Sequence, residues 1–210
     1  MEKSAKKGTT TVGVIYKDGV VIAADQLATL GDIKVNQKIQ KVIPITKNVV
    51  MTTAGMVGDN QAIVRLLKAQ MKLYILEETE PTVNSVATLL SNILSDKYLY
   101  SYLPYQLQDL IGGYDTKARL YSMDMVGGIG EEHDVAATGS GMTVAYGILD
   151  AGYKKNMTEE QAVKLAVQAI VSARKRISSV GGENVTVYVV DSKGAREISP
   201  DKIKKLVDNC

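Results

Sequence analysis

Apolar and polar positions along the chain first predict strands. Residues 10–16 and 19–25 are rich in β-branched and apolar side chains, and the polar turn Lys17-Asp18-Gly19 between them is a hairpin signal. The stretch from Val20 to Ala24 is continuously apolar, which is typical of a strand covered on both faces. The hairpin therefore belongs to a sheet that lies between other layers. Further strands are predicted at 42–45, 49–54, 105–113, 118–123, about 134–137 and 184–190.

Between these strands the apolar residues recur every three or four positions, which predicts helices. The segment 59–78 has this spacing. Thr158 and Gln161 have the spacing of a capping box, so another helix starts there and runs to about Ile177, before the glycines at 181–182. The remaining helices are predicted from Thr82 to about Tyr98, from the loop 138–141 through Gly152, and from Pro200 to Val207.

The order of the predicted elements is strands, two helices, strands, two helices and strands. This order favours two sheets packed face to face, with helices outside them, over a repeated βαβ unit. No element is assigned to the mixed segment 26–40, and the glycine-rich segment 127–130 is interpreted as a loop. The sequence therefore predicts a single α+β domain.

Composition and charge narrow the class of protein. The chain has 210 residues, 45% of them hydrophobic, and its net charge of +2 gives no sign of a nucleic acid or a membrane surface as partner. No apolar run approaches the roughly 20 residues that span a bilayer. The single cysteine, Cys210, excludes an intrachain disulfide and favours a reducing compartment such as the cytoplasm. The polar, basic leader 1–8 has no apolar core and is not a secretory signal.

The stretch Gly8-Thr9-Thr10-Thr11 at the head of the first strand is the leading candidate for chemistry. A threonine hydroxyl becomes a competent nucleophile only when a base takes its proton. Cleavage after Gly8 would expose the α-amino group of Thr9, whose reference pKa of about 8 suits that task after a modest downward shift. The alternative interpretation is that three threonines before a strand only begin the strand.

Three further residues would support such a nucleophile. Lys41 lies between apolar neighbours at the start of a strand, and a buried ammonium group there would lower the pKa of the Thr9 amine and stabilise the alkoxide. Asp25 ends the second strand and could orient Lys41. The backbone N–H of Gly55 could hold an oxyanion. Each residue also has a purely structural interpretation, as a charge at a strand end or a turn glycine.

Other chemistries are poorly supported. A catalytic triad would have to use His133, the only histidine, with Asp134 and Ser140, and a thiol protease would have to pair His133 with Cys210. One histidine and one cysteine form no metal-ligand cluster, and the glycine-rich turns match no phosphate-binding motif. We therefore expect neither a metal nor a cofactor.

The chain resembles the β subunits of the archaeal proteasome, which are N-terminal-nucleophile hydrolases. The resemblance implies a four-layer αββα sandwich of two mainly antiparallel sheets. It extends from Gly8 to about Val190. The stretches that carry it are Gly8-Thr9-Thr10-Thr11-Val12-Gly13, the strand end at Asp25, Lys41, Thr53-Ala54-Gly55-Met56-Val57-Gly58-Asp59, Val86-Ala87-Thr88-Leu89-Leu90-Ser91-Asn92 and Ala137-Thr138-Gly139-Ser140-Gly141.

This resemblance implies roles for individual residues. Residues 1–8 would be a propeptide, removed between Gly8 and Thr9, and 9–210 a single β-type domain. Thr9 would be the nucleophile, Lys41 would tune it, Asp25 would hold Lys41, Ser140 would bond near the amine, and the Gly55 amide would bind the oxyanion. An extended substrate would contact the Thr29 backbone, as in strand addition. An apolar first specificity pocket would be lined by Ala28, Ile39, Thr53 and Val57.

The resemblance also implies partners. These are proteasome α subunits and other β subunits, in heptameric rings that form a four-ring stack. An ATP-dependent unfoldase would dock on the α rings, and the substrates would be unfolded polypeptides.

Two positions depart from the family pattern Arg-Asp-Ser-x-Ser-Gly-Gly. The stretch here is Arg176-Ile177-Ser178-Ser179-Val180-Gly181-Gly182, so Ile177 replaces the aspartate and Val180 replaces the second serine. An alternative function is therefore a catalytically weak or silent structural subunit that needs an active sibling. A third interpretation, a binding domain without hydrolase ancestry, would make the matches at Thr9, Asp25, Lys41 and Ser140 coincidental.

Overall fold

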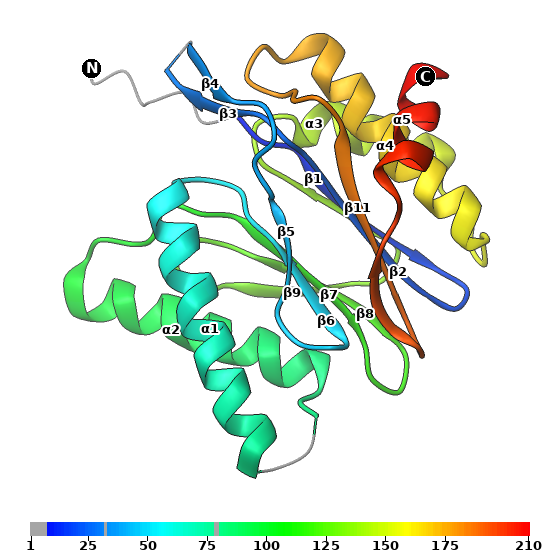
Figure 1. Ribbon diagram of the computed structural model, residues 1–210. Helices are drawn as coiled ribbons and strands as arrows, with labels where there is room; N and C mark the ends of the chain where they lie inside the picture. The colour runs from blue at the N-terminus through cyan, green and yellow to red at the C-terminus, as the bar shows by residue number, and fades with distance from the viewer. Residues whose placement is uncertain (1–7, 32, 78–79) are drawn as a thin grey trace.

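The chain folds into four layers, helices–sheet–sheet–helices, as Figure 1 shows. The computed structural model describes residues 8–31, 33–77 and 80–210. Residues 1–7 of the expected propeptide, and residue 78 at the expected end of the first helix, lie outside the described residues. Within the described residues the strands form two five-stranded sheets and one two-stranded hairpin.

The first sheet contains the N-terminal hairpin, and every strand pair in it is antiparallel. Its strand order is β10-β1-β2-β11-β12, so the long apolar strand β2 lies in the middle. This position agrees with the uninterrupted burial of β2. The strands are β1 (Thr11–Tyr16), β2 (Gly19–Asp25), β10 (Val135–Thr138), β11 (Val185–Asp191) and β12 (Gly194–Glu197).

The second sheet is an antiparallel meander in chain order, β5-β6-β7-β8-β9. A separate hairpin, β3–β4, precedes it. The strands of the sheet are β5 (Val42–Pro44), β6 (Val49–Thr52), β7 (Asp109–Tyr114), β8 (Ala118–Met123) and β9 (Ile129–Glu132), and those of the hairpin are β3 (Ala28–Leu30) and β4 (Ile33–Asn36).

Helices cover the outer face of each sheet. Helices α1 (Val57–Glu77) and α2 (Val83–Ser101) lie on the second sheet. Helices α3 (Met142–Gly152), α4 (Glu159–Arg176) and α5 (Pro200–Asp208) lie on the first. Three apolar clusters match the three interfaces of this arrangement: one under α3–α5, one under α1 and α2, and one between the sheets. The predicted α+β sandwich is confirmed.

The sequence prediction missed four strands. Strands β3 and β4 lie in the segment 26–40, where no element was assigned, and β9 begins inside the predicted loop 127–130. Strand β12 was not predicted at all. All four are short and contain at most one buried residue each, and two of them form the separate hairpin while the others lie at sheet edges. Strands of this kind need no apolar alternation, so the pattern does not reveal them.

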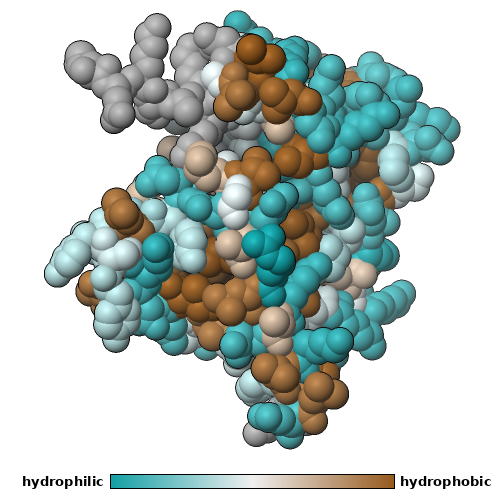
Figure 2. Space-filling model, turned by 60° about the vertical axis from the view of Figure 1, so that its left-hand side comes forward, coloured by the Kyte–Doolittle hydropathy of each residue, from teal (hydrophilic) through white to brown (hydrophobic). Residues whose placement is uncertain are grey.

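Large hydrophobic side chains are also exposed, and Figure 2 shows hydrophobic residues, in brown, on the surface. They come from the β3–β4 hairpin, from α1 and from the end of α2. Where such side chains form large patches, they mark surfaces that pack against other proteins. The most exposed of these side chains are Leu30, Ile33, Val35, Leu73, Leu76, Leu99, Tyr100, Tyr102 and Leu103.

The capping box at the start of α4 gives the first prediction. The Thr158 hydroxyl accepts a hydrogen bond from Gln161 N, and the Gln161 side chain accepts one from Thr158 N. Thr158→Ala removes the first bond and should lower the free energy of unfolding by about 1 kcal/mol in urea denaturation. Thr158→Ser is the matched control, since it keeps the hydroxyl. Equal stability of the two variants would contradict a stabilising cap.

Candidate active site

Thr9 lies where three strand ends meet. Thr11, at the start of β1, is paired with Ala24 near the end of β2 and with Thr138 at the end of β10. Antiparallel neighbours bring the start of one strand to the end of the next, so Asp25 and Ser140, far apart in sequence, both lie next to Thr9. Thr9 itself is buried, with 6% of its surface exposed.

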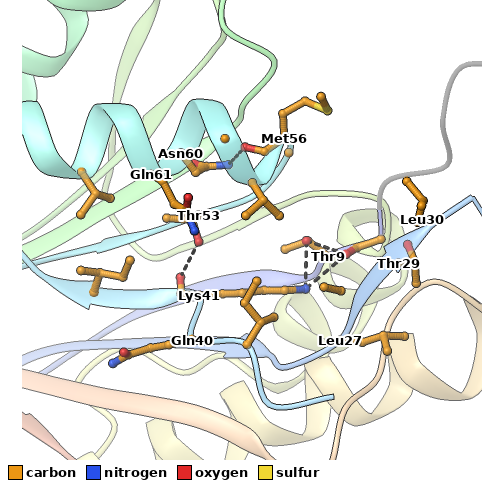
Figure 3. Close-up of a pocket in the computed structure, with 18 of the residues that line it drawn as sticks. Thr9, Leu27, Thr29, Leu30, Gln40, Lys41, Thr53, Met56, Asn60 and Gln61 are labelled. Carbon is orange, nitrogen blue, oxygen red and sulfur yellow. Dashed lines mark hydrogen bonds between the residues drawn. The ribbon is translucent and has the colours of Figure 1, made fainter. Parts of the chain in front are cut away.

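Lys41 reaches this edge from the second sheet, where it precedes β5. Its Nζ donates hydrogen bonds to Asp25 Oδ1 at 2.8 Å, to Thr9 Oγ1 at 3.0 Å and to the Gly8 carbonyl oxygen at 3.2 Å. These acceptors match the three donors of an ammonium group. Figure 3 shows the Lys41 side chain extended toward Thr9. The site is therefore built across both sheets.

Asp25 is fully buried, and its carboxylate has four donors. Oδ1 accepts from Lys41 Nζ and from Thr10 N at 2.9 Å. Oδ2 accepts from Leu27 N at 3.2 Å and from Gly181 N at 3.0 Å. Two carboxylate oxygens offer about four lone-pair sites, so this buried anion is fully hydrogen-bonded. Its position is thereby fixed by β1, by the end of β2 and by the segment after α4.

The electrostatics of Lys41 follow from this burial. Burial lowers the pKa of Lys41 below its usual value, and the neighbouring Asp25 carboxylate opposes that shift. A cation held in this place favours negative charge on the Thr9 hydroxyl, 3.0 Å from its Nζ. It would also disfavour a second positive charge on a nearby amine.

The bond between Gly8 and Thr9 lies within the same network. Thr9 Oγ1 donates to the Gly8 carbonyl oxygen at 2.6 Å, and Lys41 donates to the same oxygen. A side chain at position 8 has no room, because a Cβ there would lie 1.6 Å from the Ser179 carbonyl oxygen. Only glycine brings this carbonyl so close to the hydroxyl.

Ser140 contacts both backbone groups of Thr9. Its Oγ accepts from Thr9 N at 3.3 Å and lies 3.4 Å from Thr9 O, to which it can donate. The Ser179 hydroxyl lies 3.5 Å from Ser140 Oγ. Sequence analysis missed Ser179 as a site residue. The sequence indicates Ser179 only by its position: it precedes Val180, in the stretch that departs from the family pattern.

The loop that carries Gly55 has an unusual backbone. Gly55 has φ +130, and a Cβ there would lie 2.1 Å from the Gln106 carbonyl oxygen, so only glycine fits. Gly55 is bridged to Leu107 as a non-hydrogen-bonded pair, because the flanking residues make the bonds: Gln108 N to Ala54 O and Met56 N to Gln106 O. The Gly55 N–H therefore points away from the Leu107 segment.

A cavity of about 490 Å³ adjoins Thr9. All of the substrate-contacting residues predicted from the sequence line it, together with Thr9, Lys41 and Gly55. Its lining is mostly apolar, and no acidic residue contributes to it. The predicted lining residues are Ala28, Thr29, Ile39, Thr53 and Val57; the analysis missed Leu27, Leu30, Gln40, Ile43, Met56, Asn60, Gln61, Val64 and Arg65.

Ile177 lies just beyond the helix it was expected to extend. Helix α4 ends at Arg176, and Ile177 is its half-buried C-cap residue, whereas the apolar stripe that precedes it is fully buried. Val180 is buried. In the described part of the chain no carboxylate is hydrogen-bonded to Ser140.

The geometry does not support the alternatives to a threonine nucleophile: a catalytic triad, a thiol protease or a metal site. His133 and Cys210 are both exposed, and neither lines the cavity beside Thr9. Residues 8–31, 33–77 and 80–210 contain no group of three or more potential metal ligands. None of the helices described is long and apolar enough to cross a membrane.

Comparison with known proteins gives a consistent result. Residues 5–190 match the family model for proteasome subunits. The chain is 46% identical to a proteasome subunit beta of Ferroglobus placidus, over 96% of this chain and 95% of that protein. It is 43% identical to a proteasome subunit beta of Archaeoglobus profundus, over 97% and 94%, and 45% identical to proteasome subunit beta 1 of Thermococcus sibiricus, over 96% and 95%. The chain belongs to the proteasome subunit family.

Proposed function

We propose that this chain is a β subunit of the proteasome core particle and a threonine endopeptidase that hydrolyses unfolded polypeptides. The observation that carries the proposal is the contact of the Thr9 hydroxyl with Lys41 Nζ, which is itself paired with the buried Asp25. The relatives named proteasome subunit beta support the same function. The proposed mechanism uses no metal or cofactor, and Thr9 is the nucleophile.

The first reaction is removal of residues 1–8. Thr9 Oγ1 gives up its proton and attacks the Gly8 carbonyl carbon. The bond from that carbon to Thr9 N breaks, Thr9 N takes up a proton, and an ester joins Gly8 to Thr9 Oγ1. Water then hydrolyses the ester, which releases the leader and leaves a free amine on Thr9. Lys41 Nζ, 3.2 Å from the Gly8 carbonyl oxygen, supports the negative charge that forms on that oxygen.

In the mature subunit the Thr9 amine acts as the base. It takes the proton of Thr9 Oγ1, which attacks the substrate carbonyl, and it returns that proton to the leaving amine as the peptide bond breaks. Water then hydrolyses the ester left on Thr9 Oγ1. Lys41 favours the neutral amine and the developing alkoxide. The N–H of Gly55, directed away from Leu107, donates to the oxyanion.

The cavity beside Thr9 binds the residue before the cleaved bond. Its lining by Ala28, Ile39, Thr53 and Val57 favours an apolar side chain. The backbone of Thr29 contacts the substrate, which binds as an extended strand.

Assembly places this site in a closed chamber. The exposed hydrophobic surface of α1, α2 and the β3–β4 hairpin supports packing against other subunits. We infer that the partners are other β subunits and proteasome α subunits, in seven-membered rings stacked four deep, with an ATP-dependent unfoldase on the α rings. The assembly works in the cytoplasm.

A second candidate function is a structural subunit with weak activity of its own. It is favoured by Ile177 and Val180, which stand where the family pattern has Asp and Ser. Ser140 consequently has a serine, Ser179, beside it rather than a carboxylate. The Thr9 amine then has one fewer group to hold it in a fixed geometry.

Thr9→Ala tests the proposal directly. The leader should stay attached in particles assembled with α subunits, because the attacking hydroxyl is gone, and intact-mass analysis would show residues 1–8 retained. Thr9→Ser is the matched control and should lose the leader. Cleavage directly after Gly8 in the alanine variant, without other proteases or active β subunits, would rule out autolysis.

Lys41→Ala should lower kcat by about 10²-fold or more and change KM little, because the charge acts on the transition state. Lys41→Arg should also fail, since a planar guanidinium does not replace a compact ammonium here. Peptide hydrolysis would be measured in rings assembled from chains that begin at Thr9. Lys38→Ala is the control, because Lys38 forms only an exposed ion pair with Glu183. Near-normal kcat in the Lys41→Ala ring would remove Lys41 from the mechanism.

Ile177→Asp, alone or with Val180→Ser, should raise the rates of maturation and of peptide hydrolysis. A misplaced base costs roughly 10²-fold in rate, so restoring the anion and its serine partner should recover part of that loss. Ile177→Asn controls for shape and polarity without charge. If the unmodified chain with α subunits alone matures fully and the aspartate brings no gain, Ile177 is a tolerated substitution and the subunit is an ordinary threonine protease.

A further inference from the structure

The ladder between β6 and the start of β7 is interrupted beside Gly55. Met51 is paired with Ile111, and the isolated bridge from Gly55 to Leu107 continues the same register. In that register Ala54 faces Gln108. Because Gly55 and Leu107 form a non-hydrogen-bonded pair, Ala54 and Gln108 should exchange two backbone hydrogen bonds.

Only one of these two bonds is made. Gln108 N donates to Ala54 O at 2.9 Å, but Ala54 N donates to the side chain of Asp109, with Oδ1 at 3.0 Å. The Gln108 carbonyl oxygen accepts instead from Thr138 Oγ1 at 3.1 Å. Thr138 Oγ1 is in turn 2.6 Å from Thr11 Oγ1, two residues after the nucleophile. The interruption thus joins the Gly55 loop to β1.

Asp109 is an unusual residue for this place. It is fully buried, on the same face of β7 as Ile111, and that face packs in the apolar cluster under α1 and α2. Its Oδ2 is buried and has no hydrogen-bond partner in the described part of the chain. Asp25, equally buried, has four donors, whereas Asp109 has one. An apolar residue would avoid this cost of burial, so a carboxyl group here calls for a specific role.

The surroundings of the Asp109 carboxyl favour its neutral form. Burial raises its pKa to about 8, and the hydrogen bond from Ala54 N only partly offsets that effect. A neutral carboxyl group still offers an acceptor oxygen, and an asparagine amide reproduces its shape.

The backbone around Gly55 shows what this bond controls. Peptide units are planar and trans, so the Gly55 N–H points opposite to the Ala54 carbonyl of the same unit. Gln108 N holds that unit, and Gln106 O holds the next one through Met56 N. The unit before it, which ends in Ala54 N, is held among the described residues by Asp109. The bonds of the two flanking units add to the bond from Gln108 N in fixing the direction of the Gly55 N–H.

We propose that Asp109 is a positioning residue for oxyanion binding: by holding Ala54 N it fixes the direction in which the Gly55 N–H points into the cavity. The inference rests on the proposed function, in which that N–H receives the substrate oxyanion. Loss of the acceptor leaves Ala54 N free to turn toward Gln108 O, and the loop then follows the regular ladder.

The test compares Asp109→Leu, which removes the acceptor, with Asp109→Asn, which keeps it. In matured rings, Asp109→Leu should lower kcat by roughly 10-fold with KM nearly unchanged, since the oxyanion exists only in the transition state. Asp109→Asn should be close to the unmodified chain. Thr52→Val is the matched control: it removes another side-chain acceptor in this ladder, the bond from Leu110 N, without touching residues 54–56. It should leave kcat unchanged.

A second measurement separates this inference from the proposed function. A peptide vinyl sulfone adds to the nucleophile without placing charge on a carbonyl oxygen, so its labelling rate should be the same in Asp109→Leu and the unmodified chain. It also counts the active sites for kcat. If the unmodified chain in fully assembled rings is neither labelled nor hydrolytic, the proposed function fails.

Other outcomes bear on Asp109 alone. Unchanged kcat in Asp109→Leu, an equal loss in Asp109→Asn, or a loss carried by KM would each overturn the positioning role. If Asp109→Leu does not assemble, the smaller Asp109→Val, which also lacks the acceptor, takes its place in every comparison.

Discussion

The buried ion pair between Asp25 and Lys41 is the interaction on which the site depends. Removing two charges from water is costly, and the cost is met only where hydrogen bonds satisfy both groups. Here they do: Asp25 has four donors and Lys41 three acceptors. Those partners come from β1, the end of β2, the segment before β5 and the segment after α4. The pair therefore forms only when the two sheets are packed against each other, so the arrangement around Thr9 depends on the complete sandwich.

The two fully buried aspartates show how surroundings set the role of a carboxyl group. Asp25 lies beside an ammonium group and four donors, and it anchors a cation. Asp109 has one donor and apolar neighbours, and burial raises its pKa to about 8. A charged carboxylate would be poorly satisfied there, so its use is as a neutral acceptor. In the proposed function one holds the group that tunes the nucleophile; the other, on our inference, holds the loop that receives the oxyanion.

Sequence patterns predicted the layers well because β2 and α4 are strongly patterned: one is apolar throughout, and the other has a capping box and an apolar stripe. They made Thr9, Asp25 and Lys41 candidates, each with a purely structural alternative, and the family resemblance favoured the catalytic interpretation. The structure brings these residues together. They could not predict β3, β4, β9 or β12, which are short and contain at most one buried residue each. Nor could they find Asp109. The role we infer for it depends on a hydrogen bond from Ala54 N to its side chain, in place of the regular backbone bond to Gln108, and no spacing of residues along the sequence predicts that bond.

The geometry of Lys41 also bears on the order of the two proposed reactions. Before cleavage all three of its donors are engaged, one of them by the Gly8 carbonyl oxygen, and Gly8 lines the cavity. A substrate carbonyl therefore cannot occupy the same place while the leader is attached. In the attached form Thr9 N is an amide that donates to Ser140 and has no basic lone pair. Breaking the bond from Gly8 to Thr9 N creates the amine, and hydrolysis of the ester then removes Gly8. Lys41 then acts on that new amine, so the charge that supports the first reaction prepares the base for the second.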